Sequence, residues 1–192
     1  MKFDRLIIAT SNEGKFSEFR EIVGDFARDI VFAPEIATLV VEESGSCYAE
    51  NAMLKARAWA KESGVVCLAD DSGLEVEALG GAPGLLSARV VPGQDGDRVM
   101  WLLSRLEGVY NRRARFVAAL ALCVPEEYTL ITEGYCYGSI ADSPHGGEGF
   151  GYDPVFIPDG YSLTFAELGV HTKNSISHRT DSFRKIYAHF MR

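Results

Sequence analysis

The chain has few cysteines, no long apolar run and no excess of basic residues, and each shortage excludes a class of protein. Its 192 residues include four cysteines, none in a C-x-x-C pair, and three of them lie in apolar runs. This pattern favours buried free thiols in a reducing compartment over disulfides. No stretch approaches the ~20 apolar residues of a membrane span, and the N-terminal segment lacks a signal-peptide pattern. We therefore expect a cytoplasmic protein that contacts no membrane.

The charge balance is acidic, with 27 Asp and Glu residues against 19 Lys and Arg residues and a net charge of -8. Nucleic-acid binders are normally basic, so we expect no nucleic-acid partner. A small anionic ligand needs only a local cluster of cations and stays compatible with this charge. The apolar fraction of 47% supplies a full core, and we expect one domain over residues 1–192.

The order of periodic segments predicts an α/β fold with a mixed sheet. It begins as strand, helix, strand and later becomes hairpin-like, so the last two long strands should pair antiparallel. A glycine-rich loop follows them at 145–154, and Ser46 is placed to cap the second helix. The expected strands lie at 6–9, 29–33, 65–69, 116–124 and 128–140, and the expected helices at 16–23, 47–63, 97–106 and after residue 179.

Two adjacent carboxylates, Asp70 and Asp71, follow the apolar run 65–69. The run predicts a buried strand, and Ser72-Gly73 predicts the turn that ends it. Carboxylates beside a buried sheet are costly unless they bind a cation or accept hydrogen bonds, so the pair is a candidate Mg²⁺ and water-activating site. If strand geometry persists, only one of the two enters a given site, because successive residues point to opposite faces. If the turn has begun, both can enter, and a merely capped turn is the alternative to a functional site.

The segment from Thr10 to Lys15 leads from a strand into a helix. A helix N-terminus exposes unpaired N–H groups and binds phosphate. Gly14 would let the backbone approach such a ligand, and Lys15 would add charge. The spacing is not that of a Walker A loop, and an ordinary turn with an N-cap is the competing interpretation.

Three further patterns are open to a functional or a structural interpretation. Asn51 and Lys55 share one helix face. Taken alone they favour a solvated polar face over the functional alternative, in which Lys55 points to an anion while Glu42 and Glu43 face a cation. Phe150 to Pro154 places aromatics among glycines, which suits stacking on a flat base, although core packing is the commoner use of such rings. The basic set Lys173, His178 and Arg179 indicates phosphate or base contact, or plain helix-end polarity.

Taken together, these segments resemble the inosine triphosphate pyrophosphatase family, the non-canonical purine nucleoside triphosphate pyrophosphatases. The resemblance covers nearly the whole chain in order, and Ser11 stands where the family often has glycine. The segments that carry it are Thr10–Lys15, Glu42–Gly45, Glu50–Ala56, Ala69–Leu74, Gly80–Gly84 with Ser87–Arg89, Gly149–Pro154 and Ser177–Arg179.

The resemblance implies an elongated α/β structure with a mixed central sheet, flanking helices, two lobes and a cleft between them, usually in a homodimer. It implies hydrolysis of ITP, dITP and XTP to the monophosphate and pyrophosphate with Mg²⁺, which removes deaminated purines from the nucleotide pool. Carried over by position, Asp71 is the proton acceptor and a metal contact, with a further metal contact in the pair Glu42 and Glu43. The implied substrate contacts are Thr10, Ser11, Asn12, Glu13, Gly14, Lys15, Lys55, Ser72, Phe150, Gly151, Tyr152, Asp153, Lys173, His178 and Arg179.

The resulting hypothesis is attack of a Mg²⁺-polarised water on the α-phosphorus, with Asp71 as the base. A carboxylate is a poor base at neutral pH, so we expect an alkaline optimum. Donors from His178, Arg179 or the loop backbone would form hydrogen bonds to the purine oxo group. Adenine, which has an amino group there, would leave these donors unpaired. A pyrophosphatase for modified pyrimidine nucleotides and a non-catalytic nucleotide sensor are the alternative functions.

Overall fold

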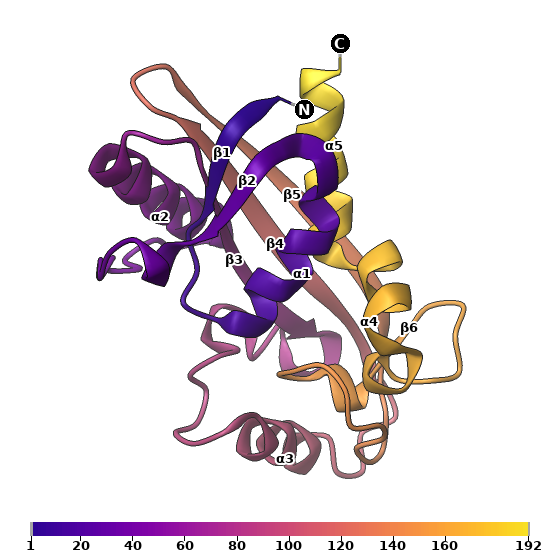
Figure 1. The fold of residues 1–192 in the computed structure, drawn as a ribbon. Coiled ribbons are helices and arrows are strands. Elements are labelled where there is room, and N and C mark those ends of the chain that lie inside the picture. The colour runs from indigo at the N-terminus through magenta and orange to yellow at the C-terminus, as the bar shows by residue number, and fades with distance from the viewer. Residues whose placement is uncertain (1, 192) are drawn as a thin grey trace. The chain divides into compact units, whose positions relative to one another are not determined.

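A mixed sheet of six strands forms the frame of the computed structural model, which describes residues 2–191 (Figure 1). The strands lie in the order β2-β1-β3-β4-β5-β6. Their bounds are β1 Phe3–Ile8, β2 Ala27–Phe32, β3 Cys67–Val76, β4 Arg113–Val124, β5 Tyr128–Ile140 and β6 Phe156–Pro158. The α/β fold with a mixed sheet that the sequence predicts is confirmed.

Both strand directions occur because the connections differ in length. β1 pairs in parallel with β2 and with β3, and a helix connects each successive pair along the chain. β4 and β5 are neighbours joined by the turn 125–127. Such a short connection reverses the chain, whereas parallel neighbours need a crossover of a dozen or more residues. β6 then pairs antiparallel with β5.

Five α-helices accompany the described strands. They are α1 Glu13–Val23, α2 Tyr48–Ser63, α3 Asp95–Arg105, α4 Phe165–Ile176 and α5 His178–Phe190. The predicted cap of α2 is wrong: Cys47 is the N-cap, and Ser46 instead donates from its backbone N–H to Glu50 Oε2 at 2.6 Å. α4 was not predicted, because Gly169, at φ 77°, interrupts its helical geometry and its apolar period. None of the helices in residues 2–191 is long and apolar enough to cross a membrane.

The strand β3 corrects the expected turn at Ser72-Gly73. It continues through these residues to Val76, and Gly73 is buried. Turn propensity is a local preference, and the pairing of β3 within the sheet overrides it. Asp70 and Asp71 therefore lie inside a continuous pleated strand, and their side chains leave opposite faces of it.

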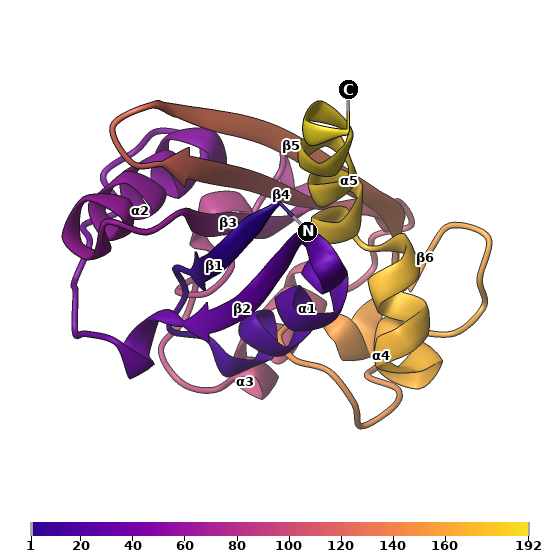
Figure 2. The same cartoon turned by 45° about the horizontal axis from the view of Figure 1, so that its top comes forward.

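The chain divides into two compact units, and β3, β4 and β5 run through both. The first unit holds the residues up to Asp71, Ala118–Gly134 and the residues from Arg179 onward. Its chain passes from β1 to β2 through α1 and back across to β3 through α2. Right-handed crossovers in opposite directions put these two helices on opposite faces of the strands, as Figure 2 shows. α5 packs on the α1 face, where Phe183 and Ile186 join Leu6, Ile8 and Phe19 in one core.

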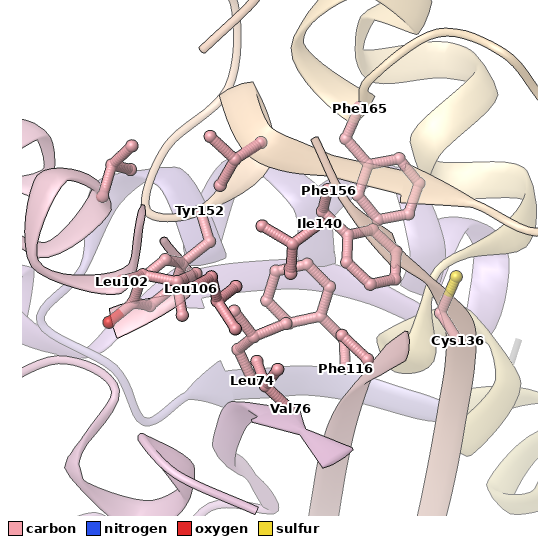
Figure 3. Close-up of a cluster of buried hydrophobic side chains, with 13 residues drawn as sticks. Leu74, Val76, Leu102, Leu106, Phe116, Cys136, Ile140, Tyr152, Phe156 and Phe165 are labelled. Carbon is pink, nitrogen blue, oxygen red and sulfur yellow. The ribbon is translucent and has the colours of Figure 1, made fainter. Parts of the chain in front are cut away.

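The second unit holds Ser72–Val117 and Tyr135–His178 and has a core of its own. In Figure 3 the rings of Phe116, Phe156 and Phe165 gather beside Leu74. The Phe116 and Phe156 centroids are 4.6 Å apart, and those of Phe156 and Phe165 are 5.2 Å apart. This core supports the loop 145–154 and the helix α4.

Candidate active site

The segment between β1 and α1 presents a capped helix N-terminus. Asn12 is the N-cap of α1, and its Oδ1 accepts a hydrogen bond from the backbone N–H of Lys15 at 2.9 Å. Thr10 Oγ1 in turn accepts from the backbone N–H of Asn12 at 3.2 Å. Ser11, Asn12 and Glu13 are exposed, while Thr10, Gly14 and Lys15 are half-buried.

Asp70 is enclosed by cations. Lys15 Nζ lies 2.6 Å from Asp70 Oδ2, and the Asp70 side chain is 0% exposed. Arg179 Nε lies 3.5 Å from Asp70 Oδ1, and Arg179 Nη1 donates to Glu18 Oε2 at 2.9 Å. Burial alone would raise the pKa of the Asp70 carboxyl, but the charges of Lys15 and Arg179 outweigh it and hold this pKa well below its ordinary value. Burial lowers the pKa of the Lys15 ammonium, and Asp70 offsets that change only in part.

Asp71 has a different set of partners, as the pleat requires. Asn51 Nδ2 donates to Asp71 Oδ2 at 2.9 Å, and Lys55 Nζ lies 3.9 Å from Asp71 Oδ1. The same Lys55 Nζ donates to Glu43 Oε1 at 2.5 Å. One ammonium thus lies against two carboxylates, one from β3 and one from the segment before α2. Glu42 is exposed, so Glu43 is the member of the acidic pair that reaches Lys55.

The Asp71 carboxyl is electrostatically unlike Asp70. Burial raises its pKa, Lys55 and the Asn51 hydrogen bond lower it, and the charges of Asp70 and Glu43 raise it further. The net pKa lies above the ordinary value for aspartate. A carboxylate with a raised pKa beside a second carboxylate is a common feature of catalytic and cation-binding sites.

The carboxylates of Asp71 and Glu43 fit a hard divalent cation that brings its own ligands. Within residues 2–191, no three His, Cys, Asp or Glu side chains are grouped as a metal site. Mg²⁺ does not require such a group, because it is usually bound by one or two carboxylates together with water and substrate phosphates. Two carboxylates that share one ammonium supply that number of protein oxygens.

The second unit contains the loop with Phe150, Gly151 and Tyr152, and it is tightly held. The ion pair between Lys173 Nζ and Asp153 Oδ2, at 2.5 Å, has side chains only 4% and 2% exposed. Asp153 Oδ2 also accepts from the Phe150 backbone N–H at 2.9 Å, and Lys173 Nζ lies 4.4 Å from the Phe150 ring centroid. Gly151 donates its N–H to Asp95 Oδ2 at 2.6 Å, and the Tyr152 hydroxyl donates to a backbone carbonyl at 3.0 Å.

His178 and Ser72 complete the predicted residues of this unit. The His178 ring is buried and stacks on Phe116, with centroids 4.8 Å apart and an interplanar angle of 12°. Ser72 is half-buried within β3. The predicted substrate residues thus form two sets, one on each unit. Thr10 to Lys15, Lys55 and Arg179 belong to the first, and Ser72, Phe150 to Asp153, Lys173 and His178 to the second.

Two further residues of the first unit, Asn51 and Glu18, are not among the predicted site residues but lie against them. Asn51 is only 1% exposed, so the solvated face that its segment favours is wrong for this residue. Glu18 is 3% exposed and pairs with Arg179. Its position three residues after Lys15, on one face of α1, is the signal that could have found it.

Solved structures of other proteins share this architecture. The solved Ham1 protein of Staphylococcus aureus superposes with a TM-score of 0.86 at 37% identity, covering 97% of this chain and 98% of that one. A HAM1 protein from Coxiella burnetii superposes with a TM-score of 0.85 at 36% identity, with the same coverage of 97% and 98%. The fold is therefore that of the Ham1 proteins.

The sequences agree with the structures. The Ham1 family pattern matches residues 6–189. The dITP/XTP pyrophosphatase of Rhodospirillum centenum is 46% identical over 190 residues, which is 96% of this chain and 94% of that protein. The dITP/XTP pyrophosphatase of Bacillus subtilis is 45% identical over 185 residues, 94% of this chain and 93% of that protein. The chain belongs to the Ham1 family, and the resemblance found in its sequence is confirmed.

Proposed function

We propose that this chain hydrolyses non-canonical purine nucleoside triphosphates, namely dITP, ITP and XTP, to the nucleoside monophosphate and pyrophosphate. Its full-length relatives are named dITP/XTP pyrophosphatases. The observation that carries the proposal is the half-buried Asp71, whose pKa is raised, beside Glu43 and the Lys55 ammonium. Such an enzyme removes deaminated purines from the nucleotide pool. We further propose that the protein is cytoplasmic and, as the family resemblance implies, a homodimer.

The first unit provides the cations and N–H groups for the triphosphate. Lys15 and Lys55 are held by Asp70 and Glu43, so each ammonium is oriented before an anion arrives. The N-terminus of α1 adds the backbone N–H groups of Glu13 and Gly14 for phosphate oxygens, since those of Asn12 and Lys15 already donate within the segment. Preoriented donors stabilise charge that develops on a leaving pyrophosphate without reorganisation at the moment of reaction.

Asp71 takes the proton in the chemical step. A water oxygen bonds to the α-phosphorus, the bond from that phosphorus to the bridging oxygen breaks, and pyrophosphate leaves with the electron pair. The water proton passes to the Asp71 carboxylate, whose orientation the hydrogen bond from Asn51 helps to fix. The raised pKa of Asp71 makes it a better base than an ordinary aspartate.

Asp71 and Glu43 would hold Mg²⁺. Glu42, the other member of the acidic pair, is exposed beside Glu43. When bound, this ion lowers the pKa of water and neutralises phosphate charge. Lys55 lies against both carboxylates, and its positive charge favours the ionised form of Asp71 against the effect of burial.

The second unit provides the contacts for the base. Phe150 offers a ring for stacking, and the Asp153–Lys173 pair fixes the backbone on which that ring sits. His178 and the N–H groups of the loop are the donors that would meet a purine oxo group. Adenine, with an amino group there, would leave a donor unpaired at a cost of about 1–3 kcal/mol.

Turnover of a nucleotide panel with Mg²⁺, followed by pyrophosphate release, tests the function. We expect dITP, ITP and XTP to be cleaved well above ATP and GTP, and the Asp71→Asn variant to bind dITP with little turnover. Comparable rates for all purine triphosphates would contradict the proposal. Preference for dUTP or methylated pyrimidine triphosphates would replace it with the pyrimidine enzyme, and binding without turnover would replace it with the sensor.

A further inference from the structure

Asn51 is a buried amide that uses both ends of its side chain. Its Nδ2 donates to Asp71 Oδ2 at 2.9 Å, and its Oδ1 accepts from the Gly45 backbone N–H at 2.8 Å. It is 1% exposed, near the N-terminal end of α2. One side chain therefore connects α2, the strand β3 and the segment before α2 that carries Glu43.

The backbone dictates which way this amide points. The Gly45 N–H can only donate, so it requires the carbonyl oxygen of Asn51 and turns the NH₂ group toward Asp71. Asp71 in turn, when ionised, can only accept. A carboxylate at position 51 would satisfy Gly45 but would face Asp71 with a like charge.

The segment at Gly45 fits closely against α2. A Cβ on Gly45 would lie 2.6 Å from Asn51 Oδ1 and 2.6 Å from Glu50 Cβ, so no side chain fits there without movement. The neighbouring Ser46 donates its hydroxyl to Glu50 Oε2 at 2.9 Å. Glu43, two residues before Gly45, reaches Lys55 one turn beyond Asn51 on the same helix. The two carboxylates of the site are thus fixed to one face of α2.

We propose that Asn51 is a positioning residue: it orients the Asp71 carboxylate and ties the segment that carries Glu43 to it. The proposal rests on the proposed function for the catalytic meaning of Asp71, and on the two Asn51 hydrogen bonds for its geometry. Asn51 is buried and both ends of its amide are engaged within the protein, so its loss should reduce the rate of the chemical step more than the binding of the nucleotide.

Steady-state kinetics of Asn51→Asp on dITP with Mg²⁺ give the first test. We expect kcat to fall about 10²-fold, the loss typical of a misplaced catalytic group, while KM stays within about twofold. The control is Ser63→Ala, which removes a hydrogen bond of the Ser63 hydroxyl to the Trp59 carbonyl at the far end of α2 and should keep full kcat. Normal kcat in Asn51→Asp would overturn the proposal.

An exchange of the two side chains separates the hydrogen bond from catalysis. Asn51→Asp alone opposes two carboxylates and should lower the melting temperature by several degrees. The double variant Asn51→Asp, Asp71→Asn restores one donor and one acceptor, so we expect the melting temperature to recover while activity does not. No recovery would overturn the assigned contact. This readout needs no turnover, so it stands apart from the assay of the proposed function; absence of turnover by the wild type would overturn that function and the catalytic part of this proposal with it.

A substitution at Gly45 tests the second Asn51 hydrogen bond, the one that Asn51 Oδ1 accepts from the Gly45 N–H. Gly45→Ala forces Asn51 or the segment to shift, and we expect kcat to fall about tenfold with little change in KM. Gly96→Ala on α3 is the matched control, because an added Cβ there meets nothing within 4 Å. Equal kcat values for the two glycine variants would contradict the proposal.

Discussion

Lys15 and Asp70 form an ion pair in which the carboxylate is entirely enclosed: Nζ lies 2.6 Å from Oδ2, and the Asp70 side chain is 0% exposed. Asp71, the next residue, faces Asn51 and Lys55 instead. The two aspartates that look equivalent in the sequence therefore contact different side chains. Asp70 orients a cation, and Asp71 is available for proton transfer and metal binding in the proposed function.

Removal of the Asp70 charge should destabilise the fold strongly. Asp70→Asn removes the carboxylate that Lys15 contacts and leaves Arg179 paired with Glu18, and breaking a buried pair in this way costs about 3–5 kcal/mol. Asp29→Asn is the matched control, because the Arg5–Asp29 pair has a similar distance of 2.7 Å but side chains 58% and 49% exposed. We expect less than about 1 kcal/mol there. Urea unfolding measures both, and equal losses would show that burial does not matter.

The Asp70 carboxylate should also make the free energy of unfolding depend on pH. The pKa of Asp70 is depressed in the folded chain, so its contribution is complete above the unfolded value of about 3.9 and shrinks as pH falls toward the folded pKa. Between neutral pH and about pH 3, the wild type should thus lose more unfolding free energy than Asp70→Asn. A larger acid loss in the variant would argue against the ion pair.

The rate of hydrolysis should rise with pH from acid into the alkaline range. The pKa of Asp71 lies above its ordinary value, so protonation removes the base at a higher pH than for an exposed aspartate. The carboxylate remains a weak base, which favours an alkaline optimum. A pH profile of kcat/KM on dITP measures this, and a maximum near about pH 6 would contradict Asp71 as the base.

Discrimination between hypoxanthine and adenine should depend on the polar atoms of His178. His178→Phe keeps a ring stacked on Phe116 but removes the ring nitrogens. Loss of one donor is worth about 1–3 kcal/mol, so the preference for ITP over ATP should fall by about tenfold or more. The control His189→Phe changes an exposed histidine on the same helix. An unchanged ITP to ATP ratio in His178→Phe would remove His178 from base recognition.

Local pattern was sufficient for most of the fold. The apolar runs before Thr10 and Asp70, and the long hairpin of β4 and β5, appear where the sequence predicts them. The misses have physical causes. Ser72-Gly73 has turn chemistry that pairing in the sheet overrides, the kink at Gly169 hides the period of α4, and β6 covers only Phe156–Pro158. Each of these three errors concerns a backbone geometry that the local residue pattern does not specify.

The sequence by itself determined which chemical groups the site contains and which family the chain belongs to, because motif order and residue type survive without coordinates. Only the tertiary structure decided which of those groups contact one another. The continued pleat of β3 sends Asp70 to Lys15 and Asp71 to Lys55, and the packing of α2 buries Asn51 between Gly45 and Asp71. Lys15, Lys55 and Asn51 each lie far along the chain from the aspartate that they contact, so sequence spacing carries no information about those contacts, whereas the Gly45–Asn51 hydrogen bond is local. Burial raises the pKa of both aspartates, but the charges of Lys15 and Arg179 outweigh it at Asp70, so the two pKa values shift in opposite directions.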